Sequence, residues 1–406
     1  MLIKDCVLKL RPGSAWLHHT ASSYKVRLND ASVAALCSMA ARLSEEEMTP
    51  DERHIYGRLA AKGIAGPDAG AADGRLVPVK DKSPLDLVEL EFSGRCNLRC
   101  AHCFSELTQR DMGRQVLERV FEGIDALEPV TLVVSGGEPL LNPLLPEALR
   151  LARSRRLRTC VMTNAVLAGP ETAALFRETG VAKAAVSLDF FEETHDGIRG
   201  AGAFRRAVAG IKNFVSAGVP VFVTAMVQES TAGRTAEFRR FCLEELGASG
   251  LRFSAVTPIG RARGAGLGLS ADSLKELFKK GLVEGGEDGG EVFERLAGGR
   301  HFHCGAGVSQ CFVSADGKVY ACHYFQNIGE AMGDLAEASL EKIYRAYPAS
   351  GAAAADFDWK KLSGCAACAH FARCKGGCRA RARLTEGGWH APDRISCALY
   401  RGRDEE

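Results

Sequence analysis

Hydrophobic residues in the middle of the chain follow two alternating spacings, which predict strands and helices in turn. Short runs rich in β-branched residues predict the strands, and amphipathic stretches such as 146–154 and 203–217 predict the helices between them. Strands joined by helical crossovers pair in parallel, so residues 85–282 predict an α/β fold with one parallel sheet. Periodicity alone leaves a barrel and a doubly wound sheet open. The strand-like runs are 87–92, 130–134, 159–163, 184–188, 220–226 and 251–256.

The first part of the chain has a different order of elements, with three short strand-like runs before two helical stretches. The second helical stretch begins with a capping box, Thr49-Pro-Asp-Glu52, and has Pro at its first helical position. This order predicts a separate small domain over 1–66, and a linker rich in Gly, Ala and Asp over 67–84. The strand-like runs are 7–10, 15–18 and 24–28, and the first helix runs from Asn29 or Asp30 to about Leu43.

Composition limits the classes of function. The 406 residues are enough for two or three domains, and the formal net charge of +2 gives a nucleic-acid partner no electrostatic support. No apolar stretch approaches the length of a membrane span, and no signal peptide opens the sequence. We therefore expect a cytoplasmic protein without a membrane partner. Fifteen cysteines in a reducing compartment favour metal binding over disulfides.

The first cysteine group, Cys96, Cys100 and Cys103, directly follows a predicted strand. Three thiolates at this spacing suit an iron–sulfur cluster whose fourth iron stays open for a reaction, whereas a closed site only holds structure or passes electrons. A zinc site that includes His102 is the alternative. This cysteine group follows a predicted strand, and the segments after strands are where α/β folds place their ligands.

Two further motifs follow predicted strands. In Ser135-Gly-Gly-Glu-Pro-Leu140, Gly136 and Gly137 permit a close approach of the backbone, Glu138 offers a carboxylate to an ammonium group, and Pro139 stiffens the exit. Ser187 and Asp189 lie two residues apart, which predicts that both face one side of a strand. They suit hydrogen bonds to a ribose or a carboxylate; capping of the following segment is the alternative.

A second cysteine system lies near the C-terminal end of the sequence. Its eight members suffice for two four-thiolate sites, of iron–sulfur or zinc type. The other four cysteines, Cys6, Cys37, Cys160 and Cys242, lie within apolar patterns and read as small buried hydrophobes. The second system consists of Cys304, Cys311, Cys322, Cys365, Cys368, Cys374, Cys378 and Cys397.

On the first cysteine group and the Gly-Gly-Glu-Pro turn, the chain resembles the radical SAM superfamily. The resemblance implies a partial (β/α)6 TIM-like barrel over 85–285 and a [4Fe–4S] cluster on which S-adenosylmethionine chelates the open iron. It assigns the Gly136–Pro139 turn to the amino group of S-adenosylmethionine. Within His195-Asp-Gly-Ile-Arg-Gly200, it assigns Arg199 to the carboxylate, a bidentate task that suits a guanidinium.

The second cysteine system resembles the SPASM domain, expected over 300–400, with two auxiliary [4Fe–4S] clusters and therefore three clusters in all. The resemblance assigns Cys304, Cys322 and Cys378 to the first auxiliary cluster, and we expect Cys311 as their fourth ligand. His323, which follows Cys322, is a candidate proton acceptor or a hydrogen-bond partner near the cluster. The second auxiliary cluster is assigned Cys365, Cys368, Cys374 and Cys397.

The N-terminal order of strands and helices resembles the winged-helix recognition element of RiPP pathways, in which a leader peptide adds a strand to the sheet edge. Together the resemblances imply a radical SAM oxidoreductase that matures a ribosomally made precursor peptide. A 5′-deoxyadenosyl radical would abstract hydrogen and a thioether or other crosslink would form, with a reducing partner such as flavodoxin or ferredoxin. A sulfatase-maturing enzyme, and a non-catalytic iron–sulfur electron carrier, are the alternatives. For the N-terminal part alone, the alternatives are a stabilising extension or a DNA-binding winged helix.

Overall fold

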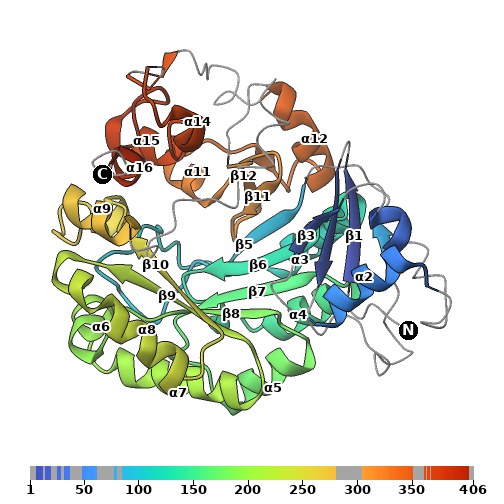
Figure 1. The fold of residues 1–406 in the computed structure, drawn as a ribbon, viewed down its shortest axis with the longest axis horizontal. Coiled ribbons are helices and arrows are strands. Elements are labelled where there is room, and N and C mark those ends of the chain that lie inside the picture. The colour runs from blue at the N-terminus through green and yellow to red at the C-terminus, as the bar shows by residue number, and fades with distance from the viewer. Residues whose placement is uncertain are drawn as a thin grey trace.

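The computed structural model describes residues 6–11, 14–19, 25–28, 32–36, 48–61, 77–79, 85–279, 304–350, 361–362, 364–365 and 367–401. Figure 1 shows a central curved sheet with helices along its outer side, a C-terminal part across from those helices, and a small N-terminal sheet at one end. No helix among these residues is long and apolar enough to cross a membrane.

The central sheet contains the six expected strands, all parallel and in sequential order from β5 to β10. A doubly wound sheet reverses its strand order at a switch point, and this one does not. The order is that of a barrel that stops after six strands, so the expected partial barrel is confirmed. The strands are β5 (Leu87–Ser93), β6 (Thr131–Gly136), β7 (Arg158–Thr163), β8 (Lys183–Ser187), β9 (Val221–Val227) and β10 (Gly250–Ala255).

Alternation along the strands separates the two faces of this sheet. In β9, Val221 and Val223 are fully buried and belong to the main hydrophobic core, whereas Phe222 and Thr224 between them are only half-buried. The buried face shares the main core with the helices, which lie along the outer side of the sheet (Figure 1). The other face is the inner face of the half barrel. The helices are α3 (Arg114–Leu127), α4 (Leu145–Ser154), α5 (Pro170–Glu178), α6 (Glu192–Arg199), α7 (Ala203–Ser216), α8 (Thr235–Arg240) and α9 (Ala271–Lys279).

The C-terminal part continues the same sheet. Strand β11 (Gln310–Val313) pairs in parallel with β5, and β12 (Lys318–Tyr320) and β13 (Gly333–Asp334) follow in antiparallel order. A second, smaller core gathers around Phe312, Tyr320 and Phe325. Its helices are α11 (His323–Ile328), α12 (Leu340–Ser350), α14 (Phe371–Cys374), α15 (Arg379–Glu386) and α16 (Arg394–Arg401).

The N-terminal part forms a four-stranded sheet in the order β3-β2-β1-β4. Its first three strands form an antiparallel meander, and β4, inside the stretch expected to be a linker, pairs in parallel with β1. The helix α2 (Pro50–Ala60) begins with the expected capping box between Thr49 and Glu52. Residues 32–36 are helical, while the rest of the first expected helix and most of the linker lie outside the described residues. The strands are β1 (Cys6–Arg11), β2 (Ser14–His19), β3 (Lys25–Leu28) and β4 (Val77–Val79).

Candidate active site

The first three cysteines lie on a loop, residues 94–111, that is closed at its neck directly after β5. The Ser93 hydroxyl donates to Oδ1 of Asp111 at 2.6 Å, and the two residues form an isolated β-bridge. The Gly94 amide donates to the carbonyl of Arg110 at 2.6 Å. The loop therefore leaves and re-enters the barrel at one point, which limits the freedom of the cysteines between.

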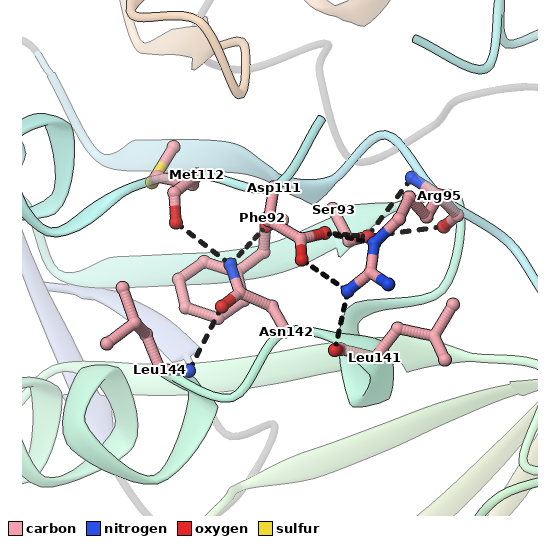
Figure 2. A network of polar contacts seen from close by, with 8 residues as sticks. All are labelled: Phe92, Ser93, Arg95, Asp111, Met112, Leu141, Asn142 and Leu144. Carbon is pink, nitrogen blue, oxygen red and sulfur yellow. Dashed lines mark hydrogen bonds and ion pairs between the residues drawn. The ribbon is translucent and has the colours of Figure 1, made fainter. Parts of the chain in front are cut away.

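Arg95, just before the first cysteine, joins this neck to the Gly-Gly-Glu-Pro segment. Its Nε donates to Oδ1 of Asp111 at 3.1 Å, and its Nη2 donates to the carbonyl of Leu141 at 3.0 Å. Figure 2 shows the guanidinium lying between the loop and the turn. One side chain thus sets the position of both motifs that the sequence singles out.

Asn142 is a second connection at the same place, and sequence reasoning missed it. Its Nδ2 donates to the carbonyls of Phe92 at 2.7 Å and Met112 at 3.0 Å, while its Oδ1 accepts from the Leu144 amide at 3.0 Å (Figure 2). The side chain is only 2% exposed. The sequence did contain a hint, because Asn142 comes directly after the apolar pair Leu140-Leu141, and an amide side chain that is buried there needs hydrogen-bond partners.

The three thiols gather in one place. Cys96, Cys100 and Cys103 pack in one small cluster with Leu98 and Ala203. Burial first, and then the neighbouring Glu138 carboxylate and thiols, raise the pKa of Cys96 to about 11. Such thiols ionise readily only beside a strong positive charge, and cluster iron supplies that charge.

One further observation fits a bound cofactor: the buried Nδ1 of His102, on the same loop, has no hydrogen-bond partner among the described residues, and a polar group of a bound molecule would satisfy it.

The glycines of the Gly-Gly-Glu-Pro turn bring its backbone directly against the cysteine loop. Gly136 has φ +126°, and a Cβ there would lie 2.3 Å from the carbonyl oxygen of Ser93. A Cβ on Gly137 would lie 2.2 Å from the carbonyl oxygen of Arg95. Any side chain at either position would push the turn away from the loop, so both glycines are required for this approach.

Glu138 is engaged by the protein itself. Its carboxylate accepts from the Leu140 amide at 3.1 Å, the Thr163 hydroxyl at 2.7 Å and the Asn164 amide at 2.8 Å. The side chain is fully buried, and burial raises its pKa to about 7. Glu138 therefore ties the turn to the end of β7. From the sequence, we instead expected its carboxylate to bind an incoming ammonium group. Pro139 follows Glu138 as the first residue of a short 3-10 helix.

Asp189 and Arg199 form a buried ion pair. Arg199 Nε donates to Oδ2 of Asp189 at 2.6 Å, and Oδ1 of Asp189 accepts from the Met226 amide at 2.8 Å. Ser187 is the last residue of β8 and is half-buried, so Asp189 lies just beyond the strand. The capping alternative for these two residues is not met, since Phe191 is the N-cap of α6 and no side chain caps it.

The structure brings together three of the four cysteines expected at the first auxiliary cluster. Burial, with Cys304 and Cys378 as electrostatic neighbours, raises the pKa of Cys322 well above its usual value. Cys311 lies elsewhere: it is 1% exposed and belongs to the core of the main sheet, whereas the next residue, Phe312, belongs to the second core. Strand alternation thus turns the Cys311 thiol away from the core that contains Cys322 and Cys378.

The four cysteines expected at the second auxiliary cluster line a single cavity of about 420 Å³. Cys397 reaches it from α16, and Cys374 from the end of α14. Four thiols around one cavity are the donor set that a [4Fe–4S] cluster takes. The lining cysteines are Cys365, Cys368, Cys374 and Cys397.

His323 begins α11 and contacts a carboxylate of the barrel. Its Nδ1 lies 3.3 Å from Oε2 of Glu89 on β5, and Oε1 of Glu89 accepts from the Ser135 hydroxyl at 2.9 Å. Phe104 and Tyr324 flank the imidazole, with ring centroids 5.2 and 4.5 Å away. Glu89 was not predicted as a site residue, although a charge within an apolar strand was a visible signal.

Family models match two parts of the chain. The model of the radical SAM superfamily matches residues 90–242, and that of the SPASM iron–sulfur cluster-binding domain matches residues 304–370. The first match contains the cysteine loop, the Gly-Gly-Glu-Pro turn and the Asp189–Arg199 pair. The second contains the cysteines from Cys304 to Cys368.

Two similar proteins are consistent with these family matches. The mycofactocin maturase MftC of Mycobacterium ulcerans (strain Agy99) is 27% identical over 333 residues, covering 75% of this chain and 85% of that protein. The AdoMet-dependent heme synthase of Methanosarcina barkeri (strain Fusaro / DSM 804) is 26% identical over 338 residues, covering 75% and 93%.

Solved structures share the fold. Streptococcus suis SuiB bound to precursor peptide SuiA aligns over 98% of this chain and 99% of that one, with a TM-score of 0.69 and 15% identity. Native anSMEcpe with bound AdoMet aligns over 79% and 95%, with a TM-score of 0.60 and 23% identity. The chain thus combines a radical SAM domain with a SPASM iron–sulfur cluster-binding domain, and the protein is a radical SAM enzyme.

Proposed function

We propose that the protein matures a ribosomally made precursor peptide. The observation that carries this proposal is the extent of the likeness to SuiB, which was crystallised with its precursor peptide and aligns with almost the whole chain. A named relative, MftC, is also a maturase. We propose the domain limits 1–66, 67–84 as linker, 85–285 and 300–400, with cytoplasmic placement.

In this proposal Cys96, Cys100 and Cys103 hold the cluster to which S-adenosylmethionine binds. When bound, the cluster and S-adenosylmethionine would supply the radical chemistry that removes a hydrogen atom from an unactivated carbon of the peptide. The Gly136–Pro139 turn presents its backbone to the amino group of S-adenosylmethionine, while Glu138 keeps that turn in place. Ser187 remains a candidate for the ribose, because it ends β8 at the carboxyl edge of the sheet.

The inside of the half barrel provides a surface for the peptide. Met162 on β7 is 44% exposed there, a high value for a large apolar residue, and the half-buried Thr224 and Met226 of β9 lie on the same face of the sheet. A mixed apolar and polar wall of this kind suits a peptide segment that is held in place rather than attacked by acid or base.

A thioether would form when the substrate radical meets a cysteine sulfur, which gives up a proton and leaves one surplus electron. We assign the proton to His323, which Glu89 orients by its contact with Nδ1. The electron would leave through the auxiliary clusters, the first held by Cys304, Cys322 and Cys378. A partner such as flavodoxin or ferredoxin would deliver the electron that starts each cycle.

The N-terminal sheet is our candidate for the leader peptide. Strand β4 occupies the free side of β1, so β3 is the remaining open edge of the antiparallel strands among the described residues. A leader segment that adds as a strand beside β3 would hold the substrate while its other end enters the barrel. The winged-helix resemblance and the alignment with SuiB both support this assignment.

The experiment uses anaerobically reconstituted protein and candidate short peptides from reading frames beside its gene, with S-adenosylmethionine and dithionite. We expect about twelve irons, from three clusters of four, release of 5′-deoxyadenosine, and a peptide lighter by two hydrogen atoms. Formylglycine in a sulfatase peptide would favour the sulfatase-maturing alternative. Conversion of an iron porphyrin instead would favour the activity named for the heme synthase relative.

A further inference from the structure

A buried polar chain connects β9 to the cysteine loop through Asp189 and Arg199. The Met226 amide of β9 and Arg199 Nε donate to different oxygens of Asp189. Asp189 is fully buried, and Arg199 is only 9% exposed. Both carboxylate oxygens are thus engaged by the protein, and neither has a surface from which to contact a cofactor.

The other end of the Arg199 guanidinium reaches the cluster ligands. Its Nη1 donates to Sγ of Cys100 at 3.8 Å, and its Nη2 lies 3.3 Å from Nε2 of His102. The end of α6 supports this approach, because the Ala101 amide donates to the carbonyl of Ile198 at 2.8 Å. A permanent cation is therefore fixed against one of the three thiols.

A positive hydrogen-bond donor at a cluster thiolate changes the energy of the reduced cluster more than that of the oxidised one. Reduction adds a negative charge, which the donor stabilises, and the effect is large in a site that excludes water. A donor held rigidly is ready in both states, whereas a mobile arginine would have to be recruited at each reduction.

We propose that Arg199 is a fixed donor to the cluster ligand Cys100, that Asp189 holds it there, and that the pair raises the reduction potential of this cluster. Asp189 is then a positioning residue for Arg199 rather than a contact of the ribose. The inference requires only the cluster, so it can be tested without a peptide and stands apart from the proposed maturase activity.

The test is a redox titration followed by EPR on the full-length, reconstituted protein. Signals that change when S-adenosylmethionine is added identify the cluster on the Cys96–Cys103 loop. In Arg199→Gln we expect the ratio of reduced to oxidised cluster at a fixed potential to fall at least threefold. That is about 30 mV for a one-electron couple, at 59 mV per tenfold. Arg199→Lys, which keeps the charge, should recover part of the loss.

Asp189→Asn separates positioning from simple charge. If the carboxylate acted only through its own negative charge, its removal would raise the potential; if it holds Arg199 in place, the potential falls, as we expect. Asp125→Asn is the matched control, because this α3 carboxylate also accepts from an arginine with both oxygens, but its partner Arg155 lies at the end of α4 and neither residue belongs to the cysteine loop. In this control, the ratio of reduced to oxidised cluster at the same fixed potential should stay within threefold of that in the unaltered protein.

A measurement on unaltered protein guards against variants that fail to load iron. With arginine labelled by ¹⁵N, pulsed EPR of the reduced cluster should detect a coupled guanidinium nitrogen. No such coupling, an Arg199→Gln potential equal to that of the original protein, or a rise in Asp189→Asn would overturn the proposal.

Discussion

Single residues decide how closely the cysteine loop and the Gly-Gly-Glu-Pro turn can approach each other. The backbone of the Gly-Gly-Glu-Pro turn touches that of the cysteine loop, and one buried carboxylate behind it, Glu138, holds the turn to β7. The glycines are a local feature of the sequence, so positions 136 and 137 were predictable as points of close approach. The hydrogen bonds of Glu138 were not predictable, because Thr163 ends the next strand, β7, and Asn164 follows it.

Gly137→Ala should separate the turn from the loop. The added methyl would lie 2.2 Å from the Arg95 carbonyl oxygen, so the backbone must move, at a cost of about 1–3 kcal/mol in the free energy of unfolding. We expect weaker binding of S-adenosylmethionine by at least tenfold, measured by equilibrium dialysis. Gly169→Ala is the control, since a methyl there meets nothing within 4 Å and should leave binding unchanged.

Glu138→Gln should change how stability depends on pH. Burial raises the pKa of Glu138 from 4.5 to about 7, so the folded state binds this proton more tightly than the unfolded chain does. The contribution of Glu138 to the free energy of unfolding is fully present below pH 4.5. It is lost as the pH rises towards and through 7, by up to about 3 kcal/mol. A glutamine cannot ionise and escapes this loss.

The measurement for that prediction is the urea midpoint of iron-free protein between pH 5 and 8. Glutamine places a donor where Glu138 accepts three hydrogen bonds, so the variant should have the lower urea midpoint at pH 5. The difference between the two urea midpoints should narrow by pH 8. A difference that is constant across the range would show that Glu138 keeps an ordinary pKa. Glu147→Gln, on the surface of α4, is the matched control.

Elements place side chains by their periodicity, and β11 illustrates both the strength and the limit of this rule. Successive side chains of a strand point to opposite faces, so Cys311 and Phe312 must face opposite sides once Gln310–Val313 forms a strand. The segment was not expected to be a strand, and Cys311 was judged from its spacing to other cysteines. The parallel pairing with β5, which lies more than 200 positions earlier, settles its direction.

Cys311→Ala should therefore leave the iron content unchanged. The thiol lies in the main apolar core, and its removal should lower the free energy of unfolding by about 1 kcal/mol through a small cavity. Cys322→Ala is the contrasting variant and should lose the irons of the first auxiliary cluster. Iron analysis and EPR of both proteins check this expectation. Equal iron loss in the two variants would return Cys311 to the ligand set.

At the scale of the whole molecule, the sequence predicted what neighbouring residues determine and missed what distant ones determine. The order of strands and helices, the cysteine spacings and the glycine turn are local patterns. The contact of Glu89 with His323 joins residues 234 positions apart, and no periodicity announces it. The same is true of Arg119 in α3, which donates to the carbonyl of Leu335.

Removal of residues 1–66 should separate peptide recognition from cofactor chemistry. If the N-terminal sheet binds the leader, the shortened protein should still release 5′-deoxyadenosine at a rate within about threefold, because the barrel core is elsewhere. Modification of the precursor peptide should fall at least a hundredfold. Mass spectrometry and nucleoside analysis on the same samples check both parts, and undiminished modification would remove the leader-binding role.

The continuous nine-stranded sheet has a consequence for protein engineering. Two family domains meet along hydrogen bonds between β5 and β11 rather than at a flexible joint. A chimera that borrows its C-terminal third from a relative must therefore import a strand that matches β5 in register and in side-chain size. Without one, the edge of β5 would be left open to pair with other chains. Crossover points for such chimeras should therefore be chosen so that β5 and its partner β11 match, and not simply at the boundary between the two family domains.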